Sequence, residues 1–329
     1  MDSAEQILNS WVEAGKVPGL AITVLRSGKV IFQKGCGFSD IDAGRGVDPT
    51  STLFRAASVS KPIAATALLR LVENGLIDLD ASLYEYVPEF PRKKYDFTIR
   101  QLAGHTAGIR GYRGKEYALN KPMSIGDSLG IFGEDPLLFK PGTGYNYNSF
   151  DWVLLSYAME KVTGSAFGEY VERNVLRPLD MTHTIPERAG DQPLEKAIFY
   201  SPAEVGFRKA SPVNNEYKLA GGGYLTTTAD ISKLGQAYLA GSIGNPELVS
   251  EFLSAQQVAG KSTYYGLGWE VSADRQGRSF YGHTGNSIGA FSLFRVYPGF
   301  STAVAILVNA TRPDLGLRLE ELLEVFVTY

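Results

Sequence analysis

Cysteine and histidine are scarce in this sequence. Its 329 residues include one cysteine, Cys36, and three histidines, at positions 105, 183 and 283. A lone cysteine excludes a disulfide within the chain, and no two histidines have the four-residue spacing or the HExxH pattern of a helical zinc site. We therefore expect no metal and no other cofactor.

Long hydrophobic runs and clusters of basic residues are also missing. The longest apolar runs, such as residues 63–72, are too short and too interrupted to span a bilayer. The net charge is −3 and the sequence has no basic cluster suited to phosphate groups, which argues against a nucleic-acid partner. With 44% hydrophobic and 20% charged residues, the composition is that of an ordinary globular protein.

The first residues, MDSAEQILNSWVEAG, lack the basic start and apolar core of a signal peptide. If Met1 is the native start, we expect the protein to stay in the cytoplasm. If a leader has been removed, we expect an exported or periplasmic protein.

Hydrophobic patterning places β-strands near both ends of the chain. Residues 20–35, LAITVLRSGKVIFQKG, predict two strands joined by a turn at Ser27 and Gly28. Strand patterns return only in YGLGWEV, RSFYGH, AFSLFRVYP and STAVAILVN, late in the chain. Helices are predicted over about 3–14, from about 59 onward, and over about 314–326.

Residues 77–240 are loop-rich and helical instead. Within them, SFDWVLLSYAMEKVTG predicts an amphipathic helix with Ser149 as its N-cap and Gly164 as its end. Strands at both ends with helices between them predict one sheet assembled from the two termini. We therefore predict a sheet domain formed by residues 1–76 and 241–329, with a mostly helical domain, residues 77–240, inserted between its two parts.

The tetrapeptide SVSK, Ser58 to Lys61, stands at the start of the predicted long helix. Residues three apart lie on one helical face, so the Ser58 hydroxyl and the Lys61 amine can meet. Burial lowers the pKa of a lysine, and a neutral lysine can activate a serine to form a covalent acyl intermediate. The S-x-x-K pattern is common by chance, so its context decides what it means.

A second serine competes for the role of nucleophile. Residues 285–289, GNSIG, match the G-x-S-x-G pattern of an α/β-hydrolase at Ser287. That pattern requires a helix after the serine, and an acid and then a histidine later in the chain. Here a strand pattern follows, and no histidine follows His283. We therefore reject Ser287 and favour Ser58.

The order of the motifs supplies the missing context. FRAASVSKP, then PGTGYNYNSFDW and YKLAGGGYLTT, then His283-Thr284-Gly285 between two late strands, resemble the serine β-lactamase and penicillin-binding protein clan. The likeness runs from Val17 to about Asn309. It is strongest to the class C branch, with its D,D-peptidase and esterase relatives and the mitochondrial β-lactamase-like serine proteases. It implies an α/β (α+β) fold, with an antiparallel sheet built from both termini, flanked by helices, and a large helical insertion.

The resemblance also implies roles for single residues. Ser58 would be the nucleophile and Lys61 its proton acceptor. Tyr147 would share the proton with Lys61 and pass it to the leaving group, and a nearby ammonium is expected to lower its pKa. Tyr145, two residues earlier, is the alternative to Tyr147. His105, in LAGHTAGI, is expected to hold a loop by hydrogen bonding rather than to act in catalysis.

Further site positions follow from the same motifs. The backbone N–H groups of Ser58 and Asn286 would form the oxyanion hole. The substrate would be bound by Ser149, His283, Thr284 and Gly285. Two of these positions depart from the amidase pattern, because Ser149 replaces an asparagine and His283 replaces a lysine that binds a carboxylate. A histidine is charged only at mildly acid pH, which makes it a weaker anchor.

These features predict a serine hydrolase that acts through an acyl-enzyme on Ser58. We expect an esterase or a peptidase-type amidase, with a small ester, amide or peptide as substrate. A true class C β-lactamase or D,D-carboxypeptidase is the alternative. A non-catalytic assembly or binding protein is the second alternative, and the intact set of Ser58, Lys61 and Tyr147 argues against it. The likeness to filament-forming proteases makes self-association worth testing.

Overall fold

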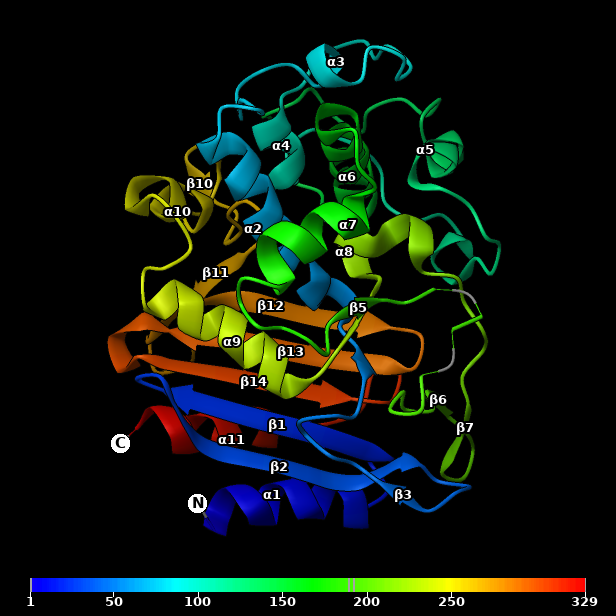
Figure 1. Ribbon diagram of the computed structural model, residues 1–329, viewed down its shortest axis with the longest axis vertical. Helices are drawn as coiled ribbons and strands as arrows, with labels where there is room; N and C mark the ends of the chain where they lie inside the picture. Colours follow the sequence, from blue (N-terminus) through cyan, green and yellow to red (C-terminus); the bar gives the residue numbers. More distant parts are fainter. Residues whose placement is uncertain (1, 189, 192, 329) are drawn as a thin grey trace.

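The computed structural model describes residues 2–188, 190–191 and 193–328. Met1, on which the expectation about cellular location depends, lies outside them. Within the described residues, an antiparallel sheet of seven strands in the order β11-β12-β13-β14-β1-β2-β3 fills the lower half of Figure 1. The strands are β1 (Gly19–Arg26), β2 (Lys29–Asp40), β3 (Arg45–Gly46), β11 (Glu270–Ala273), β12 (Ser279–Ser287), β13 (Ala290–Tyr297) and β14 (Thr302–Val308).

The pairing of β1 with β14 joins the two ends of the chain. Leu20 lies opposite Val308 and Arg26 opposite Thr302, with an unbroken antiparallel register between them. The blue and orange strands therefore lie side by side in Figure 1. The expectation of one sheet built from both termini is confirmed.

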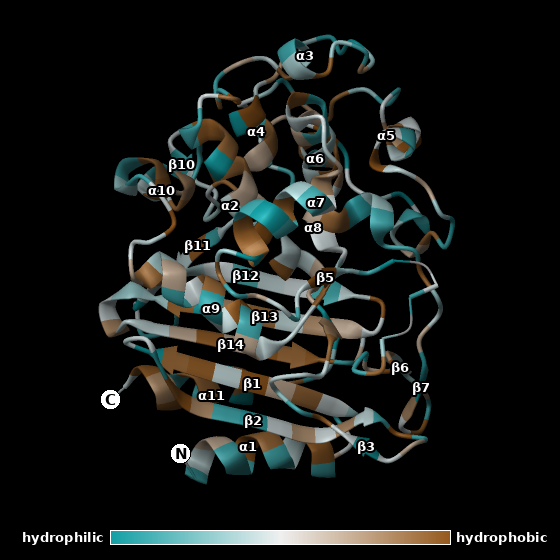
Figure 2. Ribbon diagram, in the orientation of Figure 1, coloured by the Kyte–Doolittle hydropathy of each residue, from teal (hydrophilic) through white to brown (hydrophobic). Residues whose placement is uncertain are grey.

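Helices cover both faces of this sheet. One face packs against α1 (Asp2–Glu13) and α11 (Arg318–Val327), and the other against α9 (Thr228–Leu239). Strand β1 is buried along nearly its whole length, which matches its hydrophobic colour in Figure 2. A strand covered on both faces has no polar side to present, which explains the apolar run LAITVL.

The turn at Ser27 and Gly28 forms as predicted. Both residues have positive φ, 48° and 79°, as a type I′ turn requires at its two central positions. This turn matches the twist of the flanking strands and closes the β1–β2 hairpin.

Helix α2 (Ser60–Glu73) runs through the middle of the molecule. Its residues from Ser60 to Leu69 are all buried, because β12, α6 (Phe150–Thr163) and α8 (Leu219–Gly222) pack around it. A helix that is enclosed on all sides needs little amphipathic character. Lys61 is therefore carried into the interior by the element on which it sits.

Shorter elements complete the upper half of Figure 1 and the edges of the sheet. The helices are α3 (Leu83–Tyr86), α4 (Ile99–Ala103), α5 (Ile125–Ser128), α7 (Phe167–Val171) and α10 (Pro246–Phe252). The strands are β4 (Phe54–Arg55), β5 (Ile185–Pro186), β6 (Tyr200–Pro202), β7 (Phe207–Lys209), β8 (Tyr224–Thr226), β9 (Gln257–Val258) and β10 (Lys261–Ser262). Over the residues described, none of the helices is long and apolar enough to cross a membrane.

Two details differ from the sequence-based expectations. Ser149 precedes α6 with helical backbone angles and makes no side-chain cap. Asn148 caps the helix instead, because its Oδ1 accepts a hydrogen bond from the Asp151 N–H at 2.8 Å.

Helix α9 falls in the segment assigned to the inserted domain, yet it packs on β1 and β14. The division of the chain into 1–76 with 241–329, and 77–240, stays a prediction.

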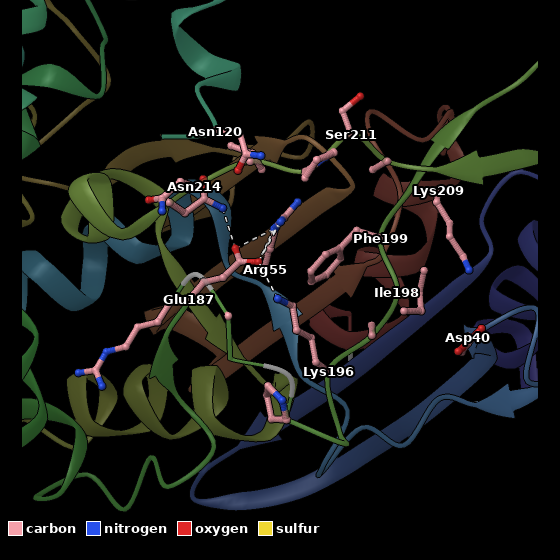
Figure 3. Close-up of a pocket in the computed structure, with 18 of the residues that line it drawn as sticks. Asp40, Arg55, Asn120, Glu187, Lys196, Ile198, Phe199, Lys209, Ser211 and Asn214 are labelled. Carbon is pink, nitrogen blue, oxygen red and sulfur yellow. Dashed lines mark hydrogen bonds and ion pairs between the residues drawn. The ribbon is translucent and has the colours of Figure 1, made fainter. Parts of the chain in front are cut away.

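A buried ion pair ties β4 to the segment that follows β5. Arg55 and Glu187 are each 5% exposed, and two hydrogen bonds of 2.8 Å join the guanidinium to the carboxylate. Figure 3 shows Arg55 and Lys196 directed at this carboxylate, with Lys196 Nζ at 3.1 Å. Burial would raise the pKa of Glu187, but the charges of Arg55 and Lys196 outweigh it and lower that pKa.

Replacing Glu187 with alanine leaves the Arg55 charge buried without its partner. We expect Glu187→Ala to lower the free energy of unfolding by about 3–5 kcal/mol, the usual effect of breaking a buried ion pair. Urea denaturation followed by circular dichroism measures this. The matched control is Lys209→Ala, which breaks an exposed pair with Asp42 and should leave the midpoint unchanged. Equal destabilisation by the two variants would contradict the buried role of Glu187.

Candidate active site

Ser58 lies in a tight 3-10 turn, Ala57–Val59, just before α2. Ala57 has a φ of 47°, in the left-handed region that an alanine rarely adopts, and it is 2% exposed. Strain of this kind persists where the surrounding structure holds it in place, and it is often found at functional sites. Strand β12 passes close by, since a Cβ atom on Gly285 would lie 2.8 Å from the Ser58 nitrogen. Glycine at 285 is thus required by packing.

Three polar side chains converge at this turn. Lys61 Nζ donates hydrogen bonds to Ser58 Oγ at 3.2 Å, to Tyr147 OH at 2.8 Å and to the Gly221 carbonyl at 2.9 Å. Tyr147 OH in turn donates to Ser58 Oγ at 2.8 Å. The three side chains form a closed triangle of hydrogen bonds around the serine oxygen.

Burial sets the protonation of this triangle. Lys61 is fully buried, and desolvation lowers its pKa to about 7 against the opposing charges of Glu270 and Asp151. A large fraction of Lys61 is therefore a neutral amine at pH 7, which is able to accept a proton. Burial raises the pKa of Tyr147, and its hydrogen bond with Ser58 offsets this only in part. The expectation of a lowered phenol pKa is wrong, because desolvation and the charge of Glu270 outweigh the hydrogen bond with Ser58.

Tyr147, and not Tyr145, occupies the position beside the serine. Among the described residues, the hydrogen-bond partners of Ser58 and Lys61 do not include Tyr145. The Tyr145 ring lies 6.3 Å from the rings of His105 and Tyr265, whereas the Tyr147 ring lies 4.7 and 5.8 Å from them. It borders the site without joining the triangle.

The ring of His105 packs against the ring of Tyr147. Its ring centroid is 4.7 Å from that of Tyr147, and its Nδ1 is hydrogen-bonded to Asp151 Oδ2 at 2.7 Å. Asn148 Nδ2 also donates to Asp151 Oδ2, at 2.7 Å. Complete burial lowers the pKa of His105 and raises that of Asp151. His105 holds this loop by hydrogen bonding, as expected, and also packs against the catalytic tyrosine candidate.

His283 does not face the open side of the site. It is 1% exposed, its Nε2 is hydrogen-bonded to Tyr265 OH at 3.0 Å, and its Nδ1 lies 2.8 Å from the Thr284 carbonyl. Burial lowers its pKa to about 4, although the charge of Glu270 opposes this. The expectation that His283 contacts the substrate stays a prediction. It is a buried, neutral partner of Tyr265.

Thr284 points towards a carboxylate on the neighbouring strand. Its N–H and Oγ1 donate to Glu270 Oε1 and Oε2, at 3.1 and 3.2 Å. Glu270 is 33% exposed, and its charge acts on Lys61 and Tyr147. The β11–β12 side of the site is thus anionic, which does not suit the binding of a substrate carboxylate.

A pocket of about 70 Å³ opens on the other side of Ser58. Ser58 and Asn286, the two predicted oxyanion-hole residues, both line it, and so does Ser149. Tyr112 forms a further wall, and burial raises its pKa to about 12 against a hydrogen bond with Ser149. The sequence-predicted positions 58, 149 and 286 are thus brought together around one cavity.

The GNSIG motif does not form a nucleophile elbow. Ser287 ends β12 and pairs with Ala290 across a hairpin, so no helix follows it as a nucleophile elbow requires. In the part of the chain that is described, no group of three or more His, Cys, Asp or Glu side chains is placed to hold a metal ion.

Sequence reasoning missed Glu270, Tyr265 and Lys218, which all border the site. Glu270 and Tyr265 belong to no recognised motif, and Lys218 lies in YKLAGGGYLTT, where the resemblance gave it no role. The run YGLGWEV indicated a strand, but it gave no sign that its glutamate would meet the strand carrying Thr284.

Comparisons with known proteins agree with this geometry. The family model described as Beta-lactamase matches residues 4–325. The human serine β-lactamase-like protein LACTB, mitochondrial, is 26% identical, and the alignment covers 91% of this chain and 72% of that protein.

Two solved structures have the same fold. A D-stereospecific amidohydrolase from Streptomyces sp. is 25% identical with a TM-score of 0.83, covering 99% of this chain and 98% of the other. A penicillin-binding protein from Bacillus halodurans is 25% identical with a TM-score of 0.82, covering 97% and 98%. With its serine in the turn before α2, its lysine on that helix and its flanked antiparallel sheet, the chain belongs to the β-lactamase family.

Proposed function

We propose that this chain is a serine acyl hydrolase, an esterase or a peptidase-type amidase, which forms an acyl-enzyme on Ser58. The observation that carries the proposal is the closed triangle of Ser58 Oγ, Lys61 Nζ and Tyr147 OH. The substrate is a small ester, amide or peptide.

Acylation follows from the position of each proton. Neutral Lys61 takes the proton of Ser58 as its Oγ forms a bond to the substrate carbonyl carbon. The resulting oxyanion faces the N–H groups of Ser58 and Asn286. As the bond to the leaving group breaks, Tyr147 gives its proton to that group and takes one from Lys61. The lysine is then neutral again.

Deacylation repeats these steps with water. The water oxygen attacks the acyl carbon and its proton passes to the neutral amine of Lys61. The Ser58–acyl bond breaks, and Ser58 recovers a proton through Tyr147. The acid product leaves with the water oxygen, and all three side chains regain their starting protonation.

The alternative, a β-lactamase or D,D-carboxypeptidase, requires a residue that binds a substrate carboxylate. The β12 side of the site offers neutral His283 and anionic Glu270 instead of a lysine. A non-catalytic binding role would have no need for the amine of Lys61 in a site that lowers its pKa to about 7. These contacts favour simple esters and amides.

Self-association stays a prediction. One solved structure with the same fold is described as an octameric penicillin-binding protein homologue from Pyrococcus abyssi; it is 23% identical with a TM-score of 0.84, and it covers 100% of this chain and 79% of the other. Light scattering of the purified chain tests whether this protein also assembles.

The first test is covalent labelling. A fluorophosphonate should add one mass equivalent at Ser58, because the triangle activates that hydroxyl. Lys61→Ala and Tyr147→Phe should each slow labelling by roughly a hundredfold or more, the usual scale of general acid–base help. Intact mass and peptide mapping give the site and the rate.

The matched control is Tyr145→Phe, which removes a nearby phenol outside the triangle and should leave the labelling rate within about twofold. Circular dichroism checks that each variant is folded. An adduct on Ser287 would contradict the assignment of Ser58 as the nucleophile. Slow labelling of Tyr145→Phe with normal labelling of Tyr147→Phe would contradict the assignment of Tyr147.

The second test uses pH. Lys61 must be neutral to accept a proton, and burial lowers its pKa to about 7, so kcat/KM for p-nitrophenyl acetate should rise with pH and level off above about 7. His283→Gln should keep this inflection, because the pKa of His283 is lowered to about 4. A profile that is flat from pH 5.5 to 8 would contradict the role of Lys61.

The third test concerns substrate choice. We expect hydrolysis of p-nitrophenyl acetate to exceed that of nitrocefin by tens- to thousandsfold, since two polar contacts worth about 1–3 kcal/mol each are absent. Ser149→Asn restores an amide on the acyl side, and Glu270→Gln removes the negative charge beside Thr284. Each variant should raise the nitrocefin rate relative to the ester rate. A wild-type enzyme that prefers nitrocefin would show that these positions are misinterpreted.

A further inference from the structure

Lys218 is a buried cation beside the candidate nucleophile. It ends a 3-10 turn, Glu216–Lys218, just before α8, and it is 6% exposed. It lines the same pocket of about 70 Å³ as Ser58, Ser149 and Asn286. A buried lysine therefore borders the cavity in which the acyl group would form.

The ammonium of Lys218 is poorly compensated. Its Nζ donates one hydrogen bond, to the Tyr117 carbonyl at 2.9 Å, and the rings of Tyr112 and Tyr217 lie 5.6 and 5.5 Å from it. For the residues that the structure describes, no carboxylate lies within ion-pair distance of this nitrogen. An ammonium has three N–H donors, so the protein satisfies only part of its capacity.

The nearest charged groups leave this side of the site positive. Arg55 and Glu187 both act on Lys218, but the Glu187 carboxylate is already bound by Arg55 and Lys196. Burial lowers the pKa of Lys218 to about 8, so most of it is protonated at pH 7. A buried charge without a counter-ion is costly, and an anion entering the pocket would relieve that cost.

The pocket lies on the acyl side of Ser58. Tyr147, the proposed proton donor to the leaving group, does not line it, whereas both proposed oxyanion-hole residues do. The leaving group therefore departs towards Tyr147 and Glu270. The group that stays on Ser58 extends into the pocket towards Lys218.

We propose that Lys218 determines substrate specificity by binding a carboxylate on the acyl group, so that the preferred acyl groups are short and derive from dicarboxylic acids. This inference rests on the proposed function, because it places the acyl group on Ser58. Tyr112 and Tyr117 wall the pocket and limit the chain to a few carbons. The carboxylate accepts hydrogen bonds from the Lys218 ammonium that the protein leaves unused.

A matched pair of reversible inhibitors tests the proposal without a leaving group. 3-Boronopropanoic acid and 3-boronopropanamide both form a tetrahedral adduct with a reactive serine and differ only in a carboxylate against a carboxamide. Wild-type protein should bind the acid about tenfold or more tightly than the amide, the scale of a charge-assisted hydrogen bond. Competition against fluorophosphonate labelling of Ser58 measures both affinities.

Variants of Lys218 test whether this side chain causes the preference for the acid over the amide. Lys218→Met keeps an apolar stem and removes the charge, and it should reduce the acid-to-amide ratio to about one. Lys218→Gln should do the same, which guards against a packing effect of methionine. The control Lys209→Met alters an exposed lysine that borders a different cavity and should keep the wild-type ratio.

The outcomes separate this proposal from the proposed function. Equal binding of the two boronic acids by wild type, or an unchanged preference in folded Lys218→Met and Lys218→Gln, would overturn the role of Lys218 while a labelled Ser58 upholds the hydrolase. A Ser58 that fluorophosphonate does not label would overturn both.

Discussion

The burial of the Lys61 amine constrains the rest of the site. An amine removed from water is stable only among hydrogen-bond acceptors, and its three acceptors come from the turn before α2, the loop before α6, and α8. These segments are far apart in the sequence, so the amine is satisfied only when all of them are in place. The same desolvation that makes Lys61 costly to bury lowers its pKa to about 7 and makes it usable as a base.

The parts of the structure that depend on local patterns could be predicted from the sequence. Alternation and turn residues gave the β1–β2 hairpin with Ser27 and Gly28 at its tip. Helical spacing brought Ser58 and Lys61 to one face, and the order of motifs placed Tyr147 near them. Strands at both ends sufficed to predict one sheet. These predictions succeeded because each depends on a pattern within the sequence, such as strand alternation, helical spacing or the order of motifs.

The environment of each side chain could not be obtained in this way. The pKa of His283 depends on its burial beside Tyr265, and the pKa of Tyr147 is raised because desolvation outweighs its hydrogen bond with Ser58. The pairing of Glu270 with Thr284 requires the register of β11 on β12. Ser149 and Asn148 are both good N-cap residues, and only the backbone angles decide between them. All of these depend on contacts between distant segments.

The antiparallel pairing of β1 with β14 also has a consequence for the order of folding. Leu20 meets Val308, so this pairing cannot begin until residue 308 has left the ribosome. Until then the early β1–β2 hairpin presents an unpaired, hydrophobic edge, which is prone to intermolecular association. Contacts of such long sequence separation also slow folding. Asn286, on a late strand, reaches Ser58 only at that stage, so a nascent chain would carry its serine and lysine long before the proposed oxyanion hole could form.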